Sequence, residues 1–141
     1  HNDYTELSAP QRVKDFFPKE SDVLLKNRFA IIQTWRSIGS IVESEPLALC
    51  DGKTIPQTGF IRNQRRYKDR TAETYHISYN SAHKWYYFPK MDRKEVLVFK
   101  VFDTDKNIDV KFTAHTAFDD PTTPEDASPR QSIEMRALVF F

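Results

Sequence analysis

Phe29-Ala30-Ile31-Ile32-Gln33-Thr34-Trp35 is the stretch of this sequence that says most about the fold. It is rich in β-branched and aromatic residues, which fit a pleated and packed surface better than a helix. Its short, almost continuous apolar run, with one polar pair inside, is typical of a largely buried strand. The fold is therefore expected to be built around a sheet.

Several shorter segments downstream have the same character. Residues 46–50 are expected to be a short apolar strand or turn entry that Asp51-Gly52 ends. The following residues 53–72, with their cluster of basic side chains, are expected to be a loop. Asn80-Ser81-Ala82 predicts a tight hairpin between the first two of the later strands. The later candidate strands are residues 74–79, 84–88, 95–102, 110–117 and 132–141.

Helices are expected only near the beginning of the chain. Ser8 is the candidate N-cap of a short helix whose apolar stripe consists of Val13, Phe16 and Phe17, and a helical turn follows at residues 21–25. Many short strands with turn signals between them, preceded by short helices, indicate an antiparallel sandwich or an open barrel.

Length and composition narrow the class of protein. The chain has 141 residues, 39% of them hydrophobic, which predicts one folded domain over residues 1–141. A net charge of +1 gives no reason to expect nucleic acid or a membrane surface as a partner. The lone Cys50 cannot form an internal disulfide and fits a reducing compartment, so we expect a cytoplasmic protein.

Three residues far apart in the sequence form a candidate metal-binding set. His1 and Asp3 are two positions apart, so on an extended segment their side chains share a face, about 6–7 Å apart at the backbone. With the distant His115 they make two histidines and one carboxylate, the set that holds non-haem Fe(II) and leaves its other positions open. A single apolar-strand histidine such as His115 is also a common core residue, so its role stays open at this point.

The last predicted strand carries alternating polar side chains that share a face with Leu138 and Phe140. Four polar groups in register on an apolar strand are costly to bury without partners. One interpretation is a lumen that binds a dicarboxylate, through bidentate arginine and a serine hydroxyl. The other is an exposed edge. The residues concerned are Arg130, Ser132, Glu134 and Arg136.

The whole chain resembles the fungal gibberellin 4 desaturase family, which includes related hydroxylases, desaturases and a cephem methoxylation component. The resemblance rests on blocks that follow the family order from the first residue to the last. These blocks are His1-Asn2-Asp3-Tyr4-Thr5, Arg28-Phe29-Ala30-Ile31-Ile32-Gln33-Thr34-Trp35-Arg36, Pro46-Leu47-Ala48-Leu49-Cys50-Asp51, His83-Lys84-Trp85-Tyr86-Tyr87-Phe88-Pro89, Glu95-Val96-Leu97-Val98-Phe99-Lys100, His115-Thr116-Ala117-Phe118-Asp119-Asp120-Pro121 and Arg130-Gln131-Ser132-Ile133-Glu134-Met135-Arg136-Ala137-Leu138.

The resemblance implies an Fe(II)/2-oxoglutarate-dependent oxygenase that hydroxylates or desaturates a small-molecule secondary metabolite. It implies a mainly β, double-stranded β-helix core of the jelly-roll or cupin-like kind, with short helices at the N-terminal end. His1, Asp3 and His115 are then the iron ligands. Arg130, helped by Ser132, is implied for the distal carboxylate of 2-oxoglutarate. Arg130 lies 15 residues after His115, which is slightly more than expected for such enzymes, so Arg136 is an alternative.

The sequence departs from the family pattern in two ways. Gln33-Thr34-Trp35-Arg36-Ser37 stands where the family usually has Asn-x-Trp-Arg-Pro. The region that precedes His-x-Asp in the family, including its first strands, is not in this sequence, so we expect part of a longer product, a homo-oligomer or pairing with a missing N-terminal segment. Two alternatives therefore stay open: a truncated, non-catalytic β-sandwich interaction module and a copper site at a true N-terminal histidine.

Overall fold

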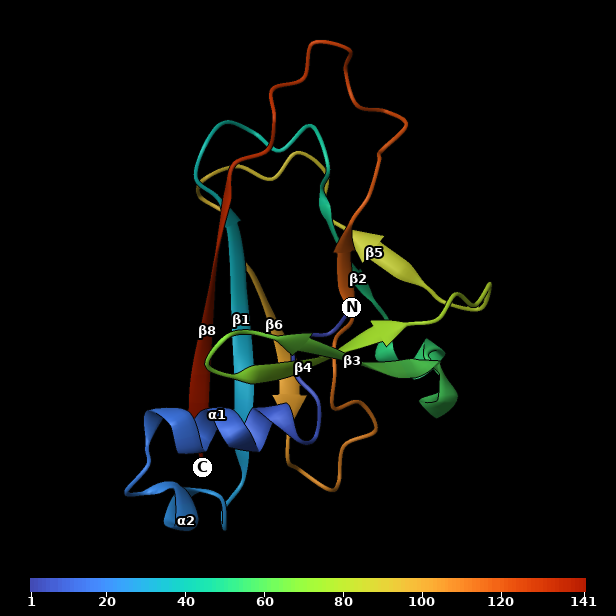
Figure 1. Ribbon diagram of the computed structural model, residues 1–141. Coiled ribbons are helices and arrows are strands. Elements are labelled where there is room, and N and C mark those ends of the chain that lie inside the picture. Colours follow the sequence, from blue (N-terminus) through green and yellow to red (C-terminus); the bar gives the residue numbers. More distant parts are fainter.

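The computed structural model describes residues 1–141 and contains two three-stranded antiparallel sheets (Figure 1). The first sheet has the order β6-β1-β8, and the second has the order β5-β2-β7. Their strands are β1 (Phe29–Ser37), β2 (Leu47–Cys50), β5 (Trp85–Tyr87), β6 (Leu97–Asp103), β7 (His115–Ala117) and β8 (Ser132–Phe140). Each strand pairs with its neighbours in antiparallel fashion.

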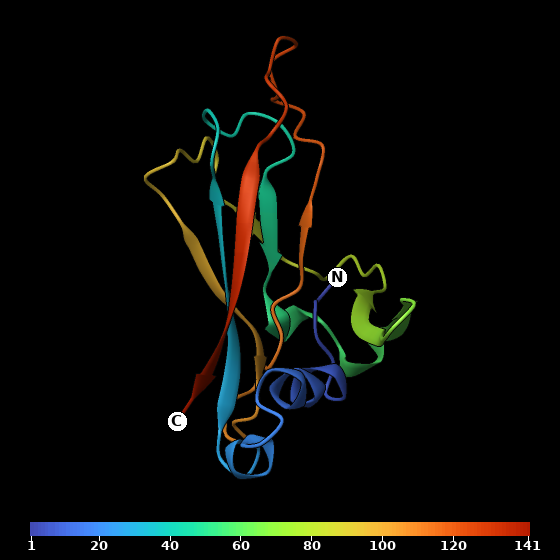
Figure 2. The ribbon, with the colours of Figure 1, turned by 60° about the vertical axis from the view of Figure 1, so that its left-hand side comes forward.

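The chain crosses repeatedly from one sheet to the other, from β1 to β2, from β5 to β6, from β6 to β7 and from β7 to β8. This is the arrangement of a jelly roll. One cluster of 14 buried hydrophobic residues includes Phe29, Trp35 and Val101 of the first sheet and Leu47 of the second. Figure 2 shows the strands of the two sheets running alongside each other. The expected mainly β, jelly-roll fold with short N-terminal helices is confirmed.

The predicted strand at residues 29–35 is the central strand of the first sheet. Its residues Phe29, Ile31, Gln33 and Trp35 are at most 1% exposed and point between the sheets. The intervening Thr34 faces outward. It pairs in register with Met135 on one side and Val98 on the other, and these two side chains are 59% and 62% exposed. The strand therefore has one buried face, which includes the polar Gln33.

Two short helices lie at one end of the sheets (Figure 1), α1 (Ser8–Phe16) and α2 (Ser21–Leu24). The Ser8 N-cap prediction is wrong, because the Thr5 hydroxyl accepts hydrogen bonds from the N–H groups of Leu7 and Ser8. Of the predicted apolar stripe, Val13 is fully buried but Phe16 is 66% exposed. Neither helix is long and apolar enough to cross a bilayer.

A two-stranded hairpin, β3 (Phe60–Arg66) and β4 (Thr71–Ile77), packs beside α1 and corrects the predicted loop at residues 53–72. Short 3-10 turns at Gly52–Thr54 and Gln57–Gly59 lead into it. The predicted hairpin around residues 80–82 is also wrong, since β4 pairs with β3 and β5 pairs with β2. Of the predicted strand 110–117, only β7 is a strand.

Candidate metal centre

His1, Asp3 and His115, far apart in the sequence, come together in the structure. One ligand atom from each lies within 4.8 Å of the others. His1 Nε2 is 3.5 Å from Asp3 Oδ1, and His115 Nε2 is 3.7 Å from Asp3 Oδ2. The three side chains are 46%, 17% and 2% exposed, in chain order, so the cluster runs from the surface into the interior.

Asn2 fixes the His-x-Asp segment in the fold, although sequence reasoning gave it no role. Its backbone exchanges two hydrogen bonds with Tyr75 of β4, at 2.8 and 2.9 Å. Its fully buried side-chain amide donates to the carbonyls of Tyr4 and Val101, at 2.7 and 3.0 Å. Val101 is the residue that the register shift between Ile31 and Ile32 leaves out of the β1–β6 pairing. A bulge of this kind re-aims backbone groups beside functional sites.

His115 is held so that one ring nitrogen is available as a ligand. Its backbone N–H donates to the carbonyl of His1 at 2.9 Å, and its ring packs edge-on against Phe99 at 5.1 Å. The carbonyl of Thr113, 3.0 Å from Nδ1, can only accept, so Nδ1 carries the hydrogen. The Nε2 lone pair therefore faces Asp3. Burial lowers the pKa of His115, which favours the neutral, ligating form.

Asp3 stays ionised although burial alone would raise its pKa. The hydrogen bond with His1 and the positive charge of Arg136 outweigh burial and lower its pKa from 3.8 to about 2. Arg136 of β8 donates to Asp3 Oδ2 at 2.8 Å. The same guanidinium also donates to Gln33 Oε1 at 3.1 Å and to Glu134 Oε2 at 2.6 Å. The Asp3 carboxylate is thus ionised and held in one orientation, which suits a metal ligand.

The polar side chains of the last strand lie beside buried residues of β1 but keep features of an exposed edge. Ser132, Glu134 and Arg136 pair in register with the buried Ser37, Trp35 and Gln33, yet β8 is an edge strand on which Glu134 and Arg136 are exposed and form an ion pair. Arg130 lies just before β8 and donates to the backbone carbonyl of Glu45, and its guanidinium lies 5.7 Å from the ring of Trp35. Arg130 has no ion pair with a carboxylate in this structure, in contrast to Arg136.

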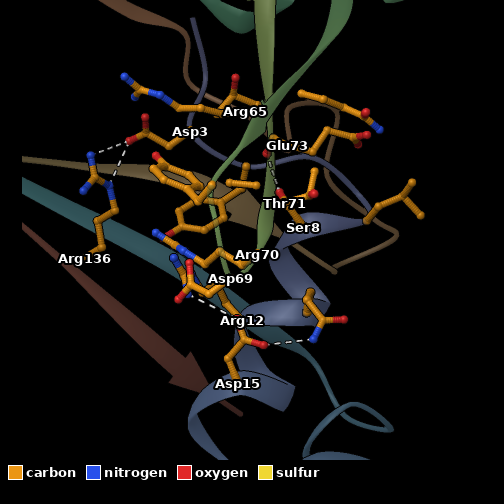
Figure 3. A pocket seen from close by; sticks show the side chains of 17 residues that line it. Asp3, Ser8, Arg12, Asp15, Arg65, Asp69, Arg70, Thr71, Glu73 and Arg136 are labelled. Atoms are coloured by element: carbon orange, nitrogen blue, oxygen red, sulfur yellow. Dashed lines mark hydrogen bonds and ion pairs between the residues drawn. The ribbon is translucent and has the colours of Figure 1, made fainter.

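A polar cleft of about 660 Å³ lies between α1 and the β3–β4 hairpin and reaches the candidate metal centre. Figure 3 shows Asp3 and Arg136 at one end and Arg12 and Asp15 at the other. Arg12 and Asp15 form an ion pair of 3.2 Å, and Arg70 lies 4.7 Å from the ring of Tyr67. The centre therefore borders a space large enough for a small organic molecule.

The donor set fits a divalent transition metal. Two imidazoles, one of them held neutral by a backbone carbonyl, and one ionised carboxylate match the ligands of mononuclear non-haem Fe(II) sites. Three protein ligands leave further positions for small ligands. The residues present therefore suit the metal that the resemblance implies.

Comparison with known proteins identifies a family for the chain. Residues 1–140 match a family model described as an oxidoreductase/YMDC permease-like domain. The chain belongs to this family. It is 37% identical over 138 residues to aspirochlorine biosynthesis protein N of Aspergillus oryzae, covering 96% of the chain and 58% of that protein. It is 33% identical to the Fe(II)/2-oxoglutarate-dependent dioxygenase nvfI of Aspergillus novofumigatus, covering 99% of the chain and 51% of that protein.

The solved structures give the same result. The iron and alpha-ketoglutarate-dependent endoperoxidase NvfI superposes with a TM-score of 0.92 at 30% identity, over 99% of this chain and 52% of that one. The hydroxylase/desaturase efuI of Hormonema carpetanum is 30% identical over the full chain and half of its own length. The predicted resemblance to hydroxylases and desaturases of the Fe(II)/2-oxoglutarate-dependent class is confirmed. The chain spans about half the length of these relatives.

Proposed function

We propose that residues 1–141 form a single oxygenase-like domain that holds Fe(II) and 2-oxoglutarate and acts on a small-molecule secondary metabolite by hydroxylation or desaturation. The observation that carries this proposal is the convergence of His1, Asp3 and His115 within 4.8 Å on a fold shared with an iron and alpha-ketoglutarate-dependent enzyme. The names of the relatives favour iron over a copper site at His1.

Within this proposal each residue of the centre has a stated task. His1, Asp3 and His115 would hold the iron, and Arg136 would keep the Asp3 carboxylate in its orientation. Iron with 2-oxoglutarate and O2 supplies the oxidising power needed to break a C–H bond. The flanking apolar residues, such as Phe99 beside the ring of His115, keep bulk water from that ligand.

Arg130 remains our choice for the distal carboxylate of 2-oxoglutarate, with Ser132 as a hydroxyl donor. Arg136 already neutralises Asp3 and Glu134, whereas Arg130 is half-buried, on the side of Trp35, and has no carboxylate partner. Its unpaired charge gives a dicarboxylate a reason to bind there.

Metal binding is the first test of the proposal. Co(II), a spectroscopic substitute for Fe(II), should bind the wild-type chain at one equivalent in a calorimetric or absorbance titration. His115→Ala should lose this binding, because one of three ligands is removed. His76→Ala changes an exposed histidine of β4 and should bind Co(II) like the wild type. Equal binding by His115→Ala and wild type would remove His115 from the centre.

The co-substrate test separates the two arginines. With Co(II) bound, Arg130→Ala should weaken 2-oxoglutarate binding by roughly 2–5 kcal/mol, because a desolvated charge pair loses one partner. Arg136→Ala should weaken it much less. The opposite order would make Arg136 the carboxylate anchor, and an absence of binding to the wild type would refute the co-substrate.

The second candidate function is a non-catalytic β-sandwich interaction module. The observation in its favour is the exposed apolar outer face of the first sheet, where Val98, Ile133 and Met135 are 62%, 54% and 59% exposed. Such a face is typical of an interaction surface. Self-association in sedimentation velocity, without succinate release from 2-oxoglutarate, would favour this candidate.

A further inference from the structure

One row of side chains crosses the first sheet beneath the candidate metal centre. In register, Gln33 of β1 pairs with Phe99 of β6 on one side and Arg136 of β8 on the other. The ring of His115 lies against Phe99, and the carboxylate of Asp3 is bound by Arg136. Neighbouring strands are about 4.8 Å apart. Gln33 therefore lies between the supports of two of the three candidate ligands.

In the carboxamide of Gln33, the oxygen has a hydrogen-bond partner and the nitrogen has none. The side chain is fully buried, and its Oε1 accepts from Arg136 Nε at 3.1 Å. Its Nε2 is buried without a hydrogen-bond partner. An amide can be placed in two orientations, but here Arg136 fixes the choice, because its N–H can donate only to the oxygen. The two N–H groups of Gln33 therefore point away from Arg136.

A buried donor without a partner is rare in native proteins and calls for a missing acceptor. A metal cation cannot be this acceptor, because it has no lone pair to accept a hydrogen bond from an N–H group. Neither the Asp3 carboxylate nor Asn2 Oδ1, a buried acceptor that also lacks a partner, forms a hydrogen bond with Gln33 Nε2. An oxygen atom of a ligand bound at the centre can supply the missing acceptor, and the nearby positive charge of Arg136 favours an anionic one.

We propose that Gln33 Nε2 donates a hydrogen bond to a carboxylate oxygen of a 2-oxo acid bound at the His1–Asp3–His115 centre. This inference rests on the proposed function and extends it, since it makes Gln33 a residue that selects for the anionic co-substrate. Through its Oε1 the same side chain also steadies Arg136 on Asp3. One amide thus links the orientation of the metal ligand to the recognition of the co-substrate.

Two substitutions isolate the free N–H group. Gln33→Glu keeps an oxygen for Arg136 and the same length, but it replaces the donor by an acceptor. Gln33→Met has a similar size and carries no donor. With Co(II) bound, both should weaken 2-oxoglutarate binding by about 10- to 100-fold, the worth of a hydrogen bond to a charged group. Gln33→Met also loses the oxygen that accepts from Arg136, so its Co(II) affinity should fall by about 10-fold, whereas Gln33→Glu keeps this oxygen and should bind Co(II) within about 3-fold of the wild type.

Thr34→Val on the outward face of the same strand is the matched control and should bind both Co(II) and 2-oxoglutarate like the wild type. A measurement on the wild-type protein needs no variant. With Zn(II) bound, 2-oxoglutarate should shift the side-chain NH2 resonances of Gln33 in NMR spectra and slow their hydrogen exchange.

The outcomes distinguish this inference from the proposed function. Unchanged 2-oxoglutarate affinity in both Gln33 variants, or unchanged NH2 resonances on saturation, would overturn the role of Gln33 alone. Binding of Co(II) but no binding of 2-oxoglutarate by the wild type would overturn the proposed co-substrate and the role of Gln33 with it. Weaker binding in the two variants, with the resonance shift, supports the inference.

Discussion

Asp3 and Asp103 are two well-buried carboxylates in the same sandwich, and each is held by an arginine. Their side chains are 17% and 2% exposed. Arg136 donates to Asp3, while Arg28 donates hydrogen bonds to both carboxylate oxygens of Asp103, at 3.2 and 3.0 Å. The pKa of each lies below its ordinary value because hydrogen bonds and positive neighbours outweigh burial. By burial and charge the two look alike.

Their remaining neighbours differ in kind. Asp103 receives hydrogen bonds from Lys100 Nζ and from the backbone N–H of Asp105, so every partner is a donor without a lone pair to offer. Asp3 instead faces the ring nitrogens of His1 and His115. Imidazole nitrogen can present a lone pair to a metal, whereas ammonium and guanidinium cannot. A paired buried carboxylate becomes a candidate site only when its neighbours can also be ligands.

The largest expected difference between the two carboxylates is in metal binding. Asp3→Asn should weaken Co(II) binding by about 100-fold or more, because the only anionic ligand of the set is lost. Asp103→Asn should leave the Co(II) affinity unchanged. Isothermal titration of both variants beside the wild type measures this directly, and comparable losses in the two would mean that the metal does not bind at Asp3.

For the stability of the metal-free protein, the larger effect is expected at Asp103 rather than at Asp3. Asp103→Asn should lower the free energy of unfolding by about 2–3 kcal/mol, since charged hydrogen bonds from Arg28 and Lys100 are lost at a buried position. Asp3→Asn should cost less, because Arg136 keeps its partner Glu134. Urea unfolding at pH 7 gives both values. A larger loss for Asp3→Asn would show that its arginine pair is the structural one.

Local patterns in the sequence predicted an antiparallel sandwich or an open barrel, and the family resemblance implied the jelly roll and the three candidate ligands. Strand β1 was predicted from its almost continuous apolar run, and His1, Asp3 and His115 match a known motif. Strand β3 was missed, since its residues 62–66 are polar and mostly exposed, and its pairing with β4 leaves no periodic signal.

The supporting residues of the centre were not predicted, because they depend on register. Asn2 finds its acceptor at a bulge in β6, 99 positions away, and Gln33 meets Arg136 only through the pairing of β1 with β8. Periodicity puts Arg130 and Arg136 on the same face of the last strand. It cannot say which of the two meets a carboxylate from the N-terminal segment, and in the structure that residue is Arg136.

Acid unfolding sharpens the comparison further. The pKa of Asp3 is lowered from 3.8 to about 2, so its contribution is complete above pH 3.8 and is lost as the pH falls toward 2. The shift corresponds to about 2 kcal/mol. Metal-free wild type should therefore lose more stability than Asp3→Asn between pH 5 and 2. Asp15→Asn, at an exposed position of α1, should follow the wild-type curve, and parallel curves for wild type and Asp3→Asn would contradict the lowered pKa.

The smallest expected effect concerns the residue that positions Asp3. Asn2→Ala removes the side-chain hydrogen bonds to the carbonyls of Tyr4 and Val101 and leaves the Val101 bulge without this donor. We expect a loss of about 1–2 kcal/mol in the free energy of unfolding and a Co(II) affinity about 10-fold weaker, because the backbone pairing with Tyr75 still holds the segment. Asn27→Ala, at an exposed position, serves as the control. If Asn2→Ala reduced stability but left the Co(II) affinity intact, Asn2 would belong with Arg28 and Asp103 as part of the scaffold rather than with the candidate centre.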